Sequence, residues 1–270
     1  MNKREAFFLI PAAAAALLWA QDSPADRVTV PFSDPARPGV VKAHLIHGGI
    51  TVKGYDGKEV IVEARARSGG KPPAAATAGM KRVAFTSTGL TVEEENNVMS
   101  VGSSSHARPI DLTIQVPRKT SLKLNCINEG AIQVEDVDGE IEVNNINGAV
   151  TLANVSGSAV AHALNGKLQA SFRRVDSKPM SFSSLNGDID VTFPPDLKAS
   201  VKMKSDRGEV LTDFDIQVKT DARPVVEDAR GKGGKYRVQV DRAISGTING
   251  GGPEIQFKNF NGAIYIRKGK

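Results

Sequence analysis

The chain has 270 residues, of which 40% are hydrophobic and only 5% are aromatic. This length suits one elongated domain or two compact ones, and a compact enzyme of this size usually carries more Trp and Tyr. The formal net charge of +5 is far below the charge density expected of a nucleic-acid-binding domain. Cys126 is the single cysteine, which excludes an intramolecular disulfide and a cysteine-based metal site.

Residues 1–20 have the layout of a secretory signal peptide. The basic start Met1–Arg4 precedes an apolar run from Ala6 to Trp19, and the small residue Ala20 follows. The run is shorter than the ~20 residues that span a bilayer, and no later segment is apolar enough for a membrane helix. We therefore expect export to a bacterial periplasm or cell surface. An uncleaved N-terminal anchor is the alternative.

After this leader, residues 21–43 are expected to form an N-terminal extension with a first strand, and residues 44–270 a single elongated domain. Residues 68–79 read SGGKPPAAATAG, which predicts a flexible loop within that domain. Residues 81–116 are predicted to be strands, because their later part alternates between apolar and polar positions.

A nine-residue unit with a central glycine repeats from Ile127 to Ala170. Apolar or small residues stand two and four positions after each glycine, as in a short strand with one buried face. The residue before the glycine is Glu, Asp, Asn or Ser; Asn-Gly and Asp-Gly pairs favour corners with φ > 0. The motif recurs outside this register, with a first copy at Ile46–Val52. The predicted corner glycines are Gly130, Gly139, Gly148, Gly157, Gly166, Gly187, Gly208, Gly246 and Gly262.

Short strands joined by glycine corners, with no intervening helices, predict an all-β fold of the β-solenoid type. Stacked coils let each strand pair with its equivalents above and below, which buries a continuous apolar interior. Asn147-Gly148 and Asn165-Gly166 match across eighteen residues, so we predict about eighteen residues per coil with two corners. Later glycines are twenty-one residues apart and predict larger coils. An antiparallel β-sandwich with regular turns is the alternative.

The order of these motifs resembles the DUF4097 family, which is described as candidate adhesins with β-strand repeats. Ile46–Asp56 fits I-x-G-G-I-x-V-x-G-x-D, Ile114–Leu122 fits I-x-V-P-x-x-x-x-L, and N-G-x-I-x-V repeats begin at Gly130. The resemblance covers almost all of the chain after the leader. It implies a single-stranded right-handed β-helix and an extracytoplasmic setting. It transfers no catalytic residue, because the shared motifs are structural glycines.

A cluster of acidic residues could form a catalytic or calcium site, since some parallel β-helices are polysaccharide lyases or hydrolases. Such a site needs several carboxylates to converge on one patch. With eighteen residues per coil, Glu142 stacks on Val160, and Thr151 stacks between Gln133 and Gln169, so no carboxylate column forms. We predict no catalytic residue, no cofactor and no metal site. The acids concerned are Glu135, Asp136, Asp138, Glu140 and Glu142.

The remaining chemically versatile side chains are scattered. His44 and His47 share a segment, but strand alternation predicts that they point to opposite faces. Cys126 lies among apolar positions and is predicted to be a buried, inert thiol. Few aromatic rings are available to stack on sugars: Phe172, Phe182, Tyr236 and Tyr265.

Basic residues give the main binding hypothesis. Lys198, Lys202 and Lys204 alternate with apolar residues, which predicts a strand with a cationic outer face. We expect further basic residues on neighbouring coils: Arg173, Arg174, Lys178 and Arg207. Such a stripe suits an anionic glycan, a lipid headgroup or an envelope protein. Alternatively, the lysines only keep the strand soluble and block edge pairing. Nucleic acid is not expected, given export and the lack of interleaved aromatic residues.

Asparagine precedes the glycine at Asn147, Asn165, Asn186 and Asn261. We interpret these residues as structural, because Asn tolerates a left-handed corner and stacked amides can hydrogen-bond along the solenoid axis. A polar recognition ladder is the alternative. The sequence as a whole predicts an exported, non-catalytic structural or interaction protein. A carbohydrate-active enzyme and an accessory protein of an envelope-stress or signalling system are the competing hypotheses.

Overall fold

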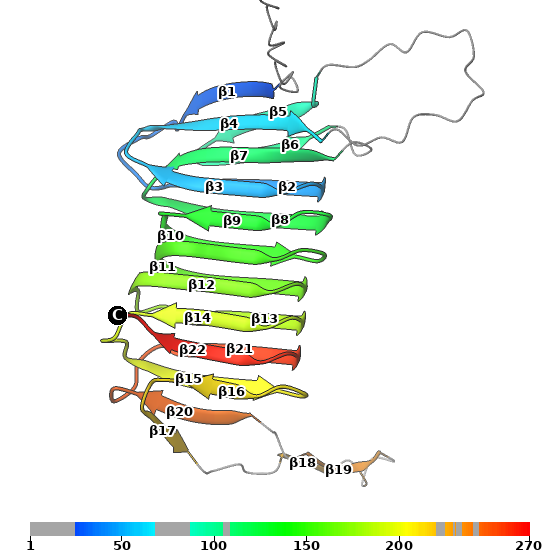
Figure 1. The fold of residues 1–270 in the computed structure, drawn as a ribbon, viewed down its shortest axis with the longest axis vertical. Coiled ribbons are helices and arrows are strands. Elements are labelled where there is room, and N and C mark those ends of the chain that lie inside the picture. Colours follow the sequence, from blue (N-terminus) through cyan, green and yellow to red (C-terminus); the bar gives the residue numbers. More distant parts are fainter. Residues whose placement is uncertain are drawn as a thin grey trace, which may run out of the picture.

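The computed structural model describes residues 25–67, 87–104, 109–219, 225–228, 230, 234–239 and 243–270. Over these ranges the chain forms strands and no α-helix, and the strands stack into an elongated solenoid (Figure 1). The expected leader at residues 1–20 and the expected loop at residues 68–79 lie outside the described residues. Within the described ranges, no helix has the length and apolar character needed to cross a bilayer.

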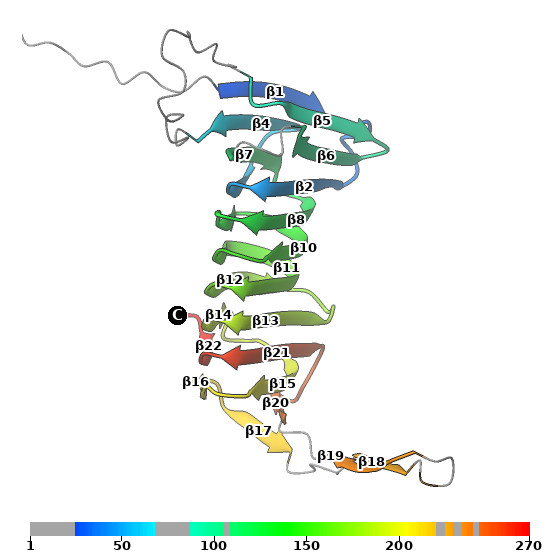
Figure 2. The same ribbon diagram turned by 90° about the vertical axis from the view of Figure 1, so that its right-hand side faces the viewer.

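The stack has two faces, each named after one of its strands (Figures 1 and 2). Each rung consists of one strand on the β2 face, a corner, and one strand on the β3 face. In stacking order, the β2 face contains β6 (Val98–Ser103), β2 (Gly39–His47), β8 (Thr120–Asn128), β10 (Asp138–Asn145), the second half of β11 (Val150–Asn165), β13 (Met180–Asn186), β21 (Glu254–Asn261) and β15 (Ala199–Ser205).

The β3 face follows the same order. It contains β4 (Glu59–Ala66), β7 (Ile110–Pro117), β3 (Ile50–Tyr55), β9 (Ile132–Glu135), the first half of β11, β12 (Leu168–Val175), β14 (Ile189–Phe193), β22 (Ile264–Lys268) and β16 (Val210–Thr212). From β7 to β16 neighbouring strands run parallel, as stacked coils require.

Two rungs stack out of chain order. The β2–β3 rung lies between the β6–β7 rung and the β8–β9 rung. The β21–β22 rung lies between the β13–β14 rung and the β15–β16 rung. The C-terminus therefore sits part-way along the stack (Figure 1). The spacing of Gly187 and Gly208 had implied that their rungs are neighbours, which is wrong, because the rung of Gly262 separates them.

Antiparallel strands cover both ends of the parallel stack. At one end β1 (Ala25–Pro31) pairs with β4, and β5 (Leu90–Glu95) pairs with β6. At the other end β20 (Ile244–Ile248) lies between β15 and β17 (Ile216–Lys219). A separate hairpin joins β18 (Val225–Asp228) to β19 (Tyr236–Gln239) (Figure 2).

Gly246 is not a corner, contrary to the sequence prediction. It lies inside β20, where Val201 and Val218 are its partners on the two flanking strands. A Cβ at this position would lie 2.5 Å from the Cγ2 of Ile216, so glycine is needed for close strand packing. The apolar residues two before and two after the glycine fit a straight strand as well as a corner, which explains the error.

The strand registers place equivalent residues of neighbouring rungs side by side. Glu142 pairs with Val160, and Thr151 lies between Gln133 and Gln169, as the repeat predicted. These partners are eighteen residues apart, and Leu168 pairs with Ile189 across twenty-one. Residues on the other side of each strand point inward, where their apolar side chains form one continuous core.

Part of this core is aromatic. The ring centroids of Phe172 and Phe193 are 5.3 Å apart, and those of Phe182 and Phe257 are 5.4 Å apart, in stacked geometry. Burial of a side chain of this size contributes about 1.5–3 kcal/mol to folding. Phe172 and Phe182 are therefore core residues and do not offer rings to a sugar.

The corners differ in one respect from the prediction. The four asparagines Asn147, Asn165, Asn186 and Asn261 are not among the described non-glycine residues with positive φ. Left-handed geometry is found instead at Glu129, Asp136 and Asn154, which also lie at corners. The expectation that asparagine supplies the left-handed corner is therefore wrong for these four asparagines.

Candidate functional site

The β2 face presents four aligned columns of side chains, because residues of equal register stack along the solenoid. The first column holds Lys42, Lys123, Glu142, Val160, Ser181, Gln256 and Lys202. The second holds His44, Asn125, Asn144, His162, Ser183, Lys258 and Lys204. The third is apolar and the fourth consists of amides. Strand alternation keeps the first three columns outside the core, and the amides lie at the corner where the strands end.

We call the third column the apolar ladder: Ile46, Ile127, Ile146, Leu164, Leu185 and Phe260. The upper isoleucines are partly covered, whereas the lower members are open to solvent. Leu164 is 43% exposed, and Leu185 and Phe260 are each 39% exposed. Contiguous exposed apolar side chains are typical of interaction surfaces. The ladder is thus a feature that core packing does not explain.

The amide ladder runs beside it at the corner and comprises Asn128, Asn147, Asn165, Asn186 and Asn261. From Asn147 to Asn261, each side-chain Nδ2 donates to the Oδ1 of the preceding asparagine in the column, at distances between 2.8 and 3.1 Å. The sequence-based interpretation as stacked amides is confirmed. The bonds occupy donors and acceptors along the column, which favours a structural role for it.

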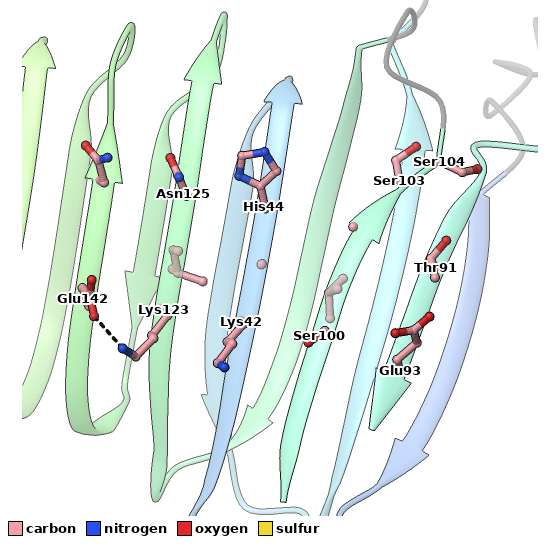
Figure 3. A pocket seen from close by; sticks show the side chains of 15 residues that line it. Lys42, His44, Thr91, Glu93, Ser100, Ser103, Ser104, Lys123, Asn125 and Glu142 are labelled. Carbon is pink, nitrogen blue, oxygen red and sulfur yellow. Dashed lines mark ion pairs between the residues drawn. The ribbon is translucent and has the colours of Figure 1, made fainter. Parts of the chain in front are cut away.

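An upper pocket of about 580 Å³ opens on the β2 face, where β5 and β6 meet β2 and β8 (Figure 3). His44 and Asn125 stand on neighbouring strands within it, and Lys123 forms an ion pair with Glu142 at 2.9 Å (Figure 3). Glu93 reaches the pocket from β5, on the far side from Glu142. The two carboxylates therefore do not form a catalytic pair.

A lower pocket of about 700 Å³ continues along the same face. Asn144 lines both pockets, so they form one hollowed surface. The lower pocket combines the exposed part of the apolar ladder with polar residues of the second column. Its lining includes His162, Leu164, Ser183, Leu185, Lys204, Asp206, Lys258 and Phe260.

The predicted cationic set is divided by the structure. Lys202 and Lys204 point outward from β15, and buried Ala199, Val201 and Met203 alternate with them, as predicted. Lys198 is exposed just before this strand. Arg207 lies at the corner after it, with its guanidinium 5.2 Å from the ring centroid of Phe260.

Arg173 and Arg174 are not on a neighbouring rung. They lie at the end of β12, and the β13–β14 and β21–β22 rungs separate β12 from β15. Arg174 forms an ion pair with Asp138 at 2.9 Å, and Lys178 pairs with Glu140. Arg174 and Lys178 are thus paired at the opposite corner, and the three cations do not extend the stripe.

The five acids that were considered as a catalytic cluster have separate partners. Glu135 pairs with Lys53 at 3.1 Å on the β3 face, and the Nδ2 of Asn154 donates to Asp136 at 2.6 Å. The other three pair with Arg174, Lys178 and Lys123, as described above. The acids thus spread over both faces and a corner. Within the described part of the chain, no group of His, Cys, Asp and Glu is arranged to hold a metal ion.

Cys126 belongs to an interior column that carries polar side chains on several rungs. Its side chain is buried, and its thiol donates to the carbonyl oxygen of Gly48 across 2.9 Å. Burial raises the pKa of the Cys126 thiol, and this effect outweighs the nearby charge of Arg67. On other rungs Asn145 and Asn259 occupy the same position and donate to glycine carbonyls. The prediction of a buried thiol is confirmed.

Sequence reasoning missed Lys258 and the apolar ladder. The register of β21 against β13 and β15 brings Lys258 between Ser183 and Lys204. In the chain it follows Ser183 by 75 residues and Lys204 by 54, so the repeat spacing does not reveal this neighbourhood. The apolar ladder could have been suspected from the sequence, because Ile146 and Leu164 each stand two residues before a glycine. Val137 and Val155 hold the same place in the repeat but are buried at the other corner, so the signal was ambiguous.

Comparison with known proteins identifies the family of this chain. The family model described as Toastrack DUF4097 matches residues 110–249. No curated protein matches the chain. A structure described as a "putative cell adhesion protein" from Clostridium sporogenes ATCC 15579 is 12% identical, with a TM-score of 0.36, and the match covers 91% of this chain and 100% of that one.

A second structure, described as a "putative adhesin" from Bacteroides fragilis NCTC 9343, is also 12% identical, with a TM-score of 0.34. The match covers 90% of this chain and 96% of that one. The family model covers more than half of the 270 residues and includes the rungs from β8 to β14. The chain therefore belongs to the Toastrack DUF4097 family.

Proposed function

We propose that this protein is exported to the bacterial envelope or cell surface and acts there as a non-catalytic interaction protein, in an adhesive or structural role. In this proposal the leader is removed near residue 20, and residues 44–270 form one right-handed solenoid domain with 18–21 residues per coil. The β2 face is the binding surface. Its partner is an anionic glycan, a lipid headgroup or an envelope protein.

The observation that supports this proposal is the continuity of the β2 face. Two pockets share Asn144, and four members of the apolar ladder line the lower one. A face that repeats one chemistry along a stack suits a ligand or partner that makes many similar contacts. The five acids considered above have separate partners, which disfavours a hydrolytic site built from them.

A glycan and lipid array tests the proposal, with the chain from Gln21 onward as the probe. Asn144→Glu places a charge between the two pockets, and Thr151→Glu places the same charge on the β3 face of the same rung. We expect a set of array features bound by the wild type and by T151E, and weakened about tenfold or more by N144E. Absence of any bound feature, or equal loss in both variants, would contradict a binding role for the β2 face.

A further inference from the structure

We propose that the lower pocket binds a single-chain amphiphile with an anionic headgroup. The acyl chain lies along the apolar ladder, and the headgroup sits at Lys258 and Lys204. This inference rests on the proposed function, because it names a ligand class for the β2 face. It deepens that proposal by assigning separate roles to the apolar and cationic sides of one pocket.

The apolar side is built from side chains on successive rungs. Leu164, Leu185 and Phe260 follow one another because Asn165 pairs with Asn186, and Asn186 pairs with Asn261, in the adjacent column. Neighbouring strands are about 4.8 Å apart, so the three side chains form a continuous strip. Ile146 extends the strip at the upper end of the pocket. An extended hydrocarbon chain can contact every rung of such a strip.

The cationic side lies at the lower end of the same strip. Lys258 pairs in register with Lys204 on β15, and both line the pocket. Arg207 stands at the adjacent corner over the ring of Phe260. Asp206 also lines the pocket and offsets part of this charge. Among the described residues at this end, Lys258, Lys204 and Arg207 outnumber the carboxylate of Asp206, and this positive charge complements a phosphate or carboxylate headgroup.

The polar residues above the lysines make the pocket directional. His162 contacts the hydroxyl of Ser183 through its Nδ1, and both stand in the same column as Lys258. The column therefore becomes more cationic from His162 toward Lys204, while the adjacent apolar ladder stays apolar down to Phe260. A ligand with a tail alone or a charge alone would use only one side. An anionic amphiphile uses both.

Titration calorimetry with dodecyl phosphate, kept below its critical micelle concentration, tests this inference. Inorganic phosphate and dodecyl maltoside serve as probes for the head alone and the tail with a neutral head. Lys258→Gln and Leu185→Ser test the two sides of the pocket. Lys167→Gln and Leu211→Ser are the matched controls, because both residues are exposed on the β3 face or its adjoining corner. Thermal unfolding of every variant reports whether it is folded.

We expect dodecyl phosphate to bind the wild type and both control variants, with K258Q and L185S each weakening binding about tenfold. Dodecyl maltoside and inorganic phosphate should bind at least about tenfold more weakly than dodecyl phosphate. The inference is overturned if dodecyl phosphate does not bind, if inorganic phosphate binds equally well, or if the control variants lose as much affinity as the pocket variants. In those cases, array features that N144E removes would still support the proposed function.

Discussion

The carbonyl oxygen of Gly130 lies 2.0 Å from the place where a Cβ on Gly148 would stand. A side chain at Gly148 would collide with the backbone of the rung beside it. The same relation continues to the next rung, because a Cβ on Gly166 would lie 2.2 Å from the carbonyl oxygen of Gly148. The corner glycines are therefore required by the distance between rungs.

Gly148→Ala should lower the free energy of unfolding by about 1–3 kcal/mol, because neighbouring corners must move apart to admit the methyl group. Gly102→Ala is the matched control, since the nearest atom to its Cβ would be the His44 carbonyl oxygen at 3.6 Å, an ordinary contact. Urea unfolding followed by circular dichroism measures both. Equal stability of the two variants would show that the corner can relax.

A clamp between Arg67 and Asp111 holds the upper corners together. Arg67 donates from Nε to both carboxylate oxygens of Asp111, at 2.9 and 2.8 Å, and the Gly49 amide donates to the same carboxylate at 2.8 Å. Arg67 also donates to the carbonyl oxygen of Glu129 on the next rung. Burial raises the pKa of Asp111, but the bonds from Arg67 and Gly49 outweigh it and leave the pKa below its ordinary value.

A lowered pKa in the folded state means that the ionised Asp111 stabilises the fold. This contribution is fully present above the unfolded pKa of about 3.9 and is lost as the pH falls through the lower folded value. Asp111→Asn should cost on the order of 1 kcal/mol at pH 7, since the pair is partly exposed. The difference from wild type should shrink below pH 4. Asp196→Asn, at an exposed loop position, should show neither effect; a pH-independent deficit in D111N would contradict the clamp.

The β21–β22 rung is needed to complete the stack, although it comes last in the chain. It supplies Phe257 to the aromatic core and pairs with strands on both of its sides. Deletion of residues 254–270 should therefore open the stack between the β13–β14 rung and the β15–β16 rung. We expect rapid hydrogen exchange in β13 to β16 and continued protection in β8 to β10, measured by mass spectrometry.

Deletion of Lys270 alone is the control for this truncation and should leave exchange almost unchanged, because this residue follows the last strand and is exposed. If the larger deletion also leaves β13 to β16 protected, the two flanking rungs can close on each other. That result would contradict the claim that the β21–β22 rung is needed to complete the stack.

Cys126 offers a test of the interior column. Cys126→Ser keeps a donor for the Gly48 carbonyl and should change the free energy of unfolding by less than about 1 kcal/mol. Cys126→Leu overfills the site and should cost about 1–3 kcal/mol. In the native wild type, a thiol reagent at pH 8 should react much more slowly than in urea, because burial raises the pKa of this thiol. Equal rates would contradict burial of the thiol.

The sequence predicted the structure well at positions where a local steric or burial requirement admits only one type of residue. Glycines at fixed spacing predicted the corners at Gly130, Gly148 and Gly166, and apolar alternation predicted the inward positions of β9 to β12. At Gly246 the same pattern failed, because an apolar–glycine–apolar sequence also fits a straight strand that is paired on both sides. Local pattern alone does not distinguish a corner from a crowded strand.

The candidate binding surface was predicted less well. Lys202 and Lys204 were identified from their alternation, but Lys258 was not, because it reaches the same column through the displaced β21 rung. Leu164 and Leu185 each stand two residues before a glycine, and the geometry of the corner turns them outward. The site depends on which rungs become neighbours.

By itself, the sequence determined that the chain forms short strands, where most of its corners fall and which side of most strands is apolar. These properties depend on residue volume, backbone freedom and alternation, which act over a few neighbouring residues. Only the tertiary structure decided that the β2–β3 and β21–β22 rungs enter the stack out of order. Each rung presents similar hydrogen-bonding edges, so backbone pairing alone does not determine which rungs become neighbours. The packing of inward side chains across the whole stack determines their order.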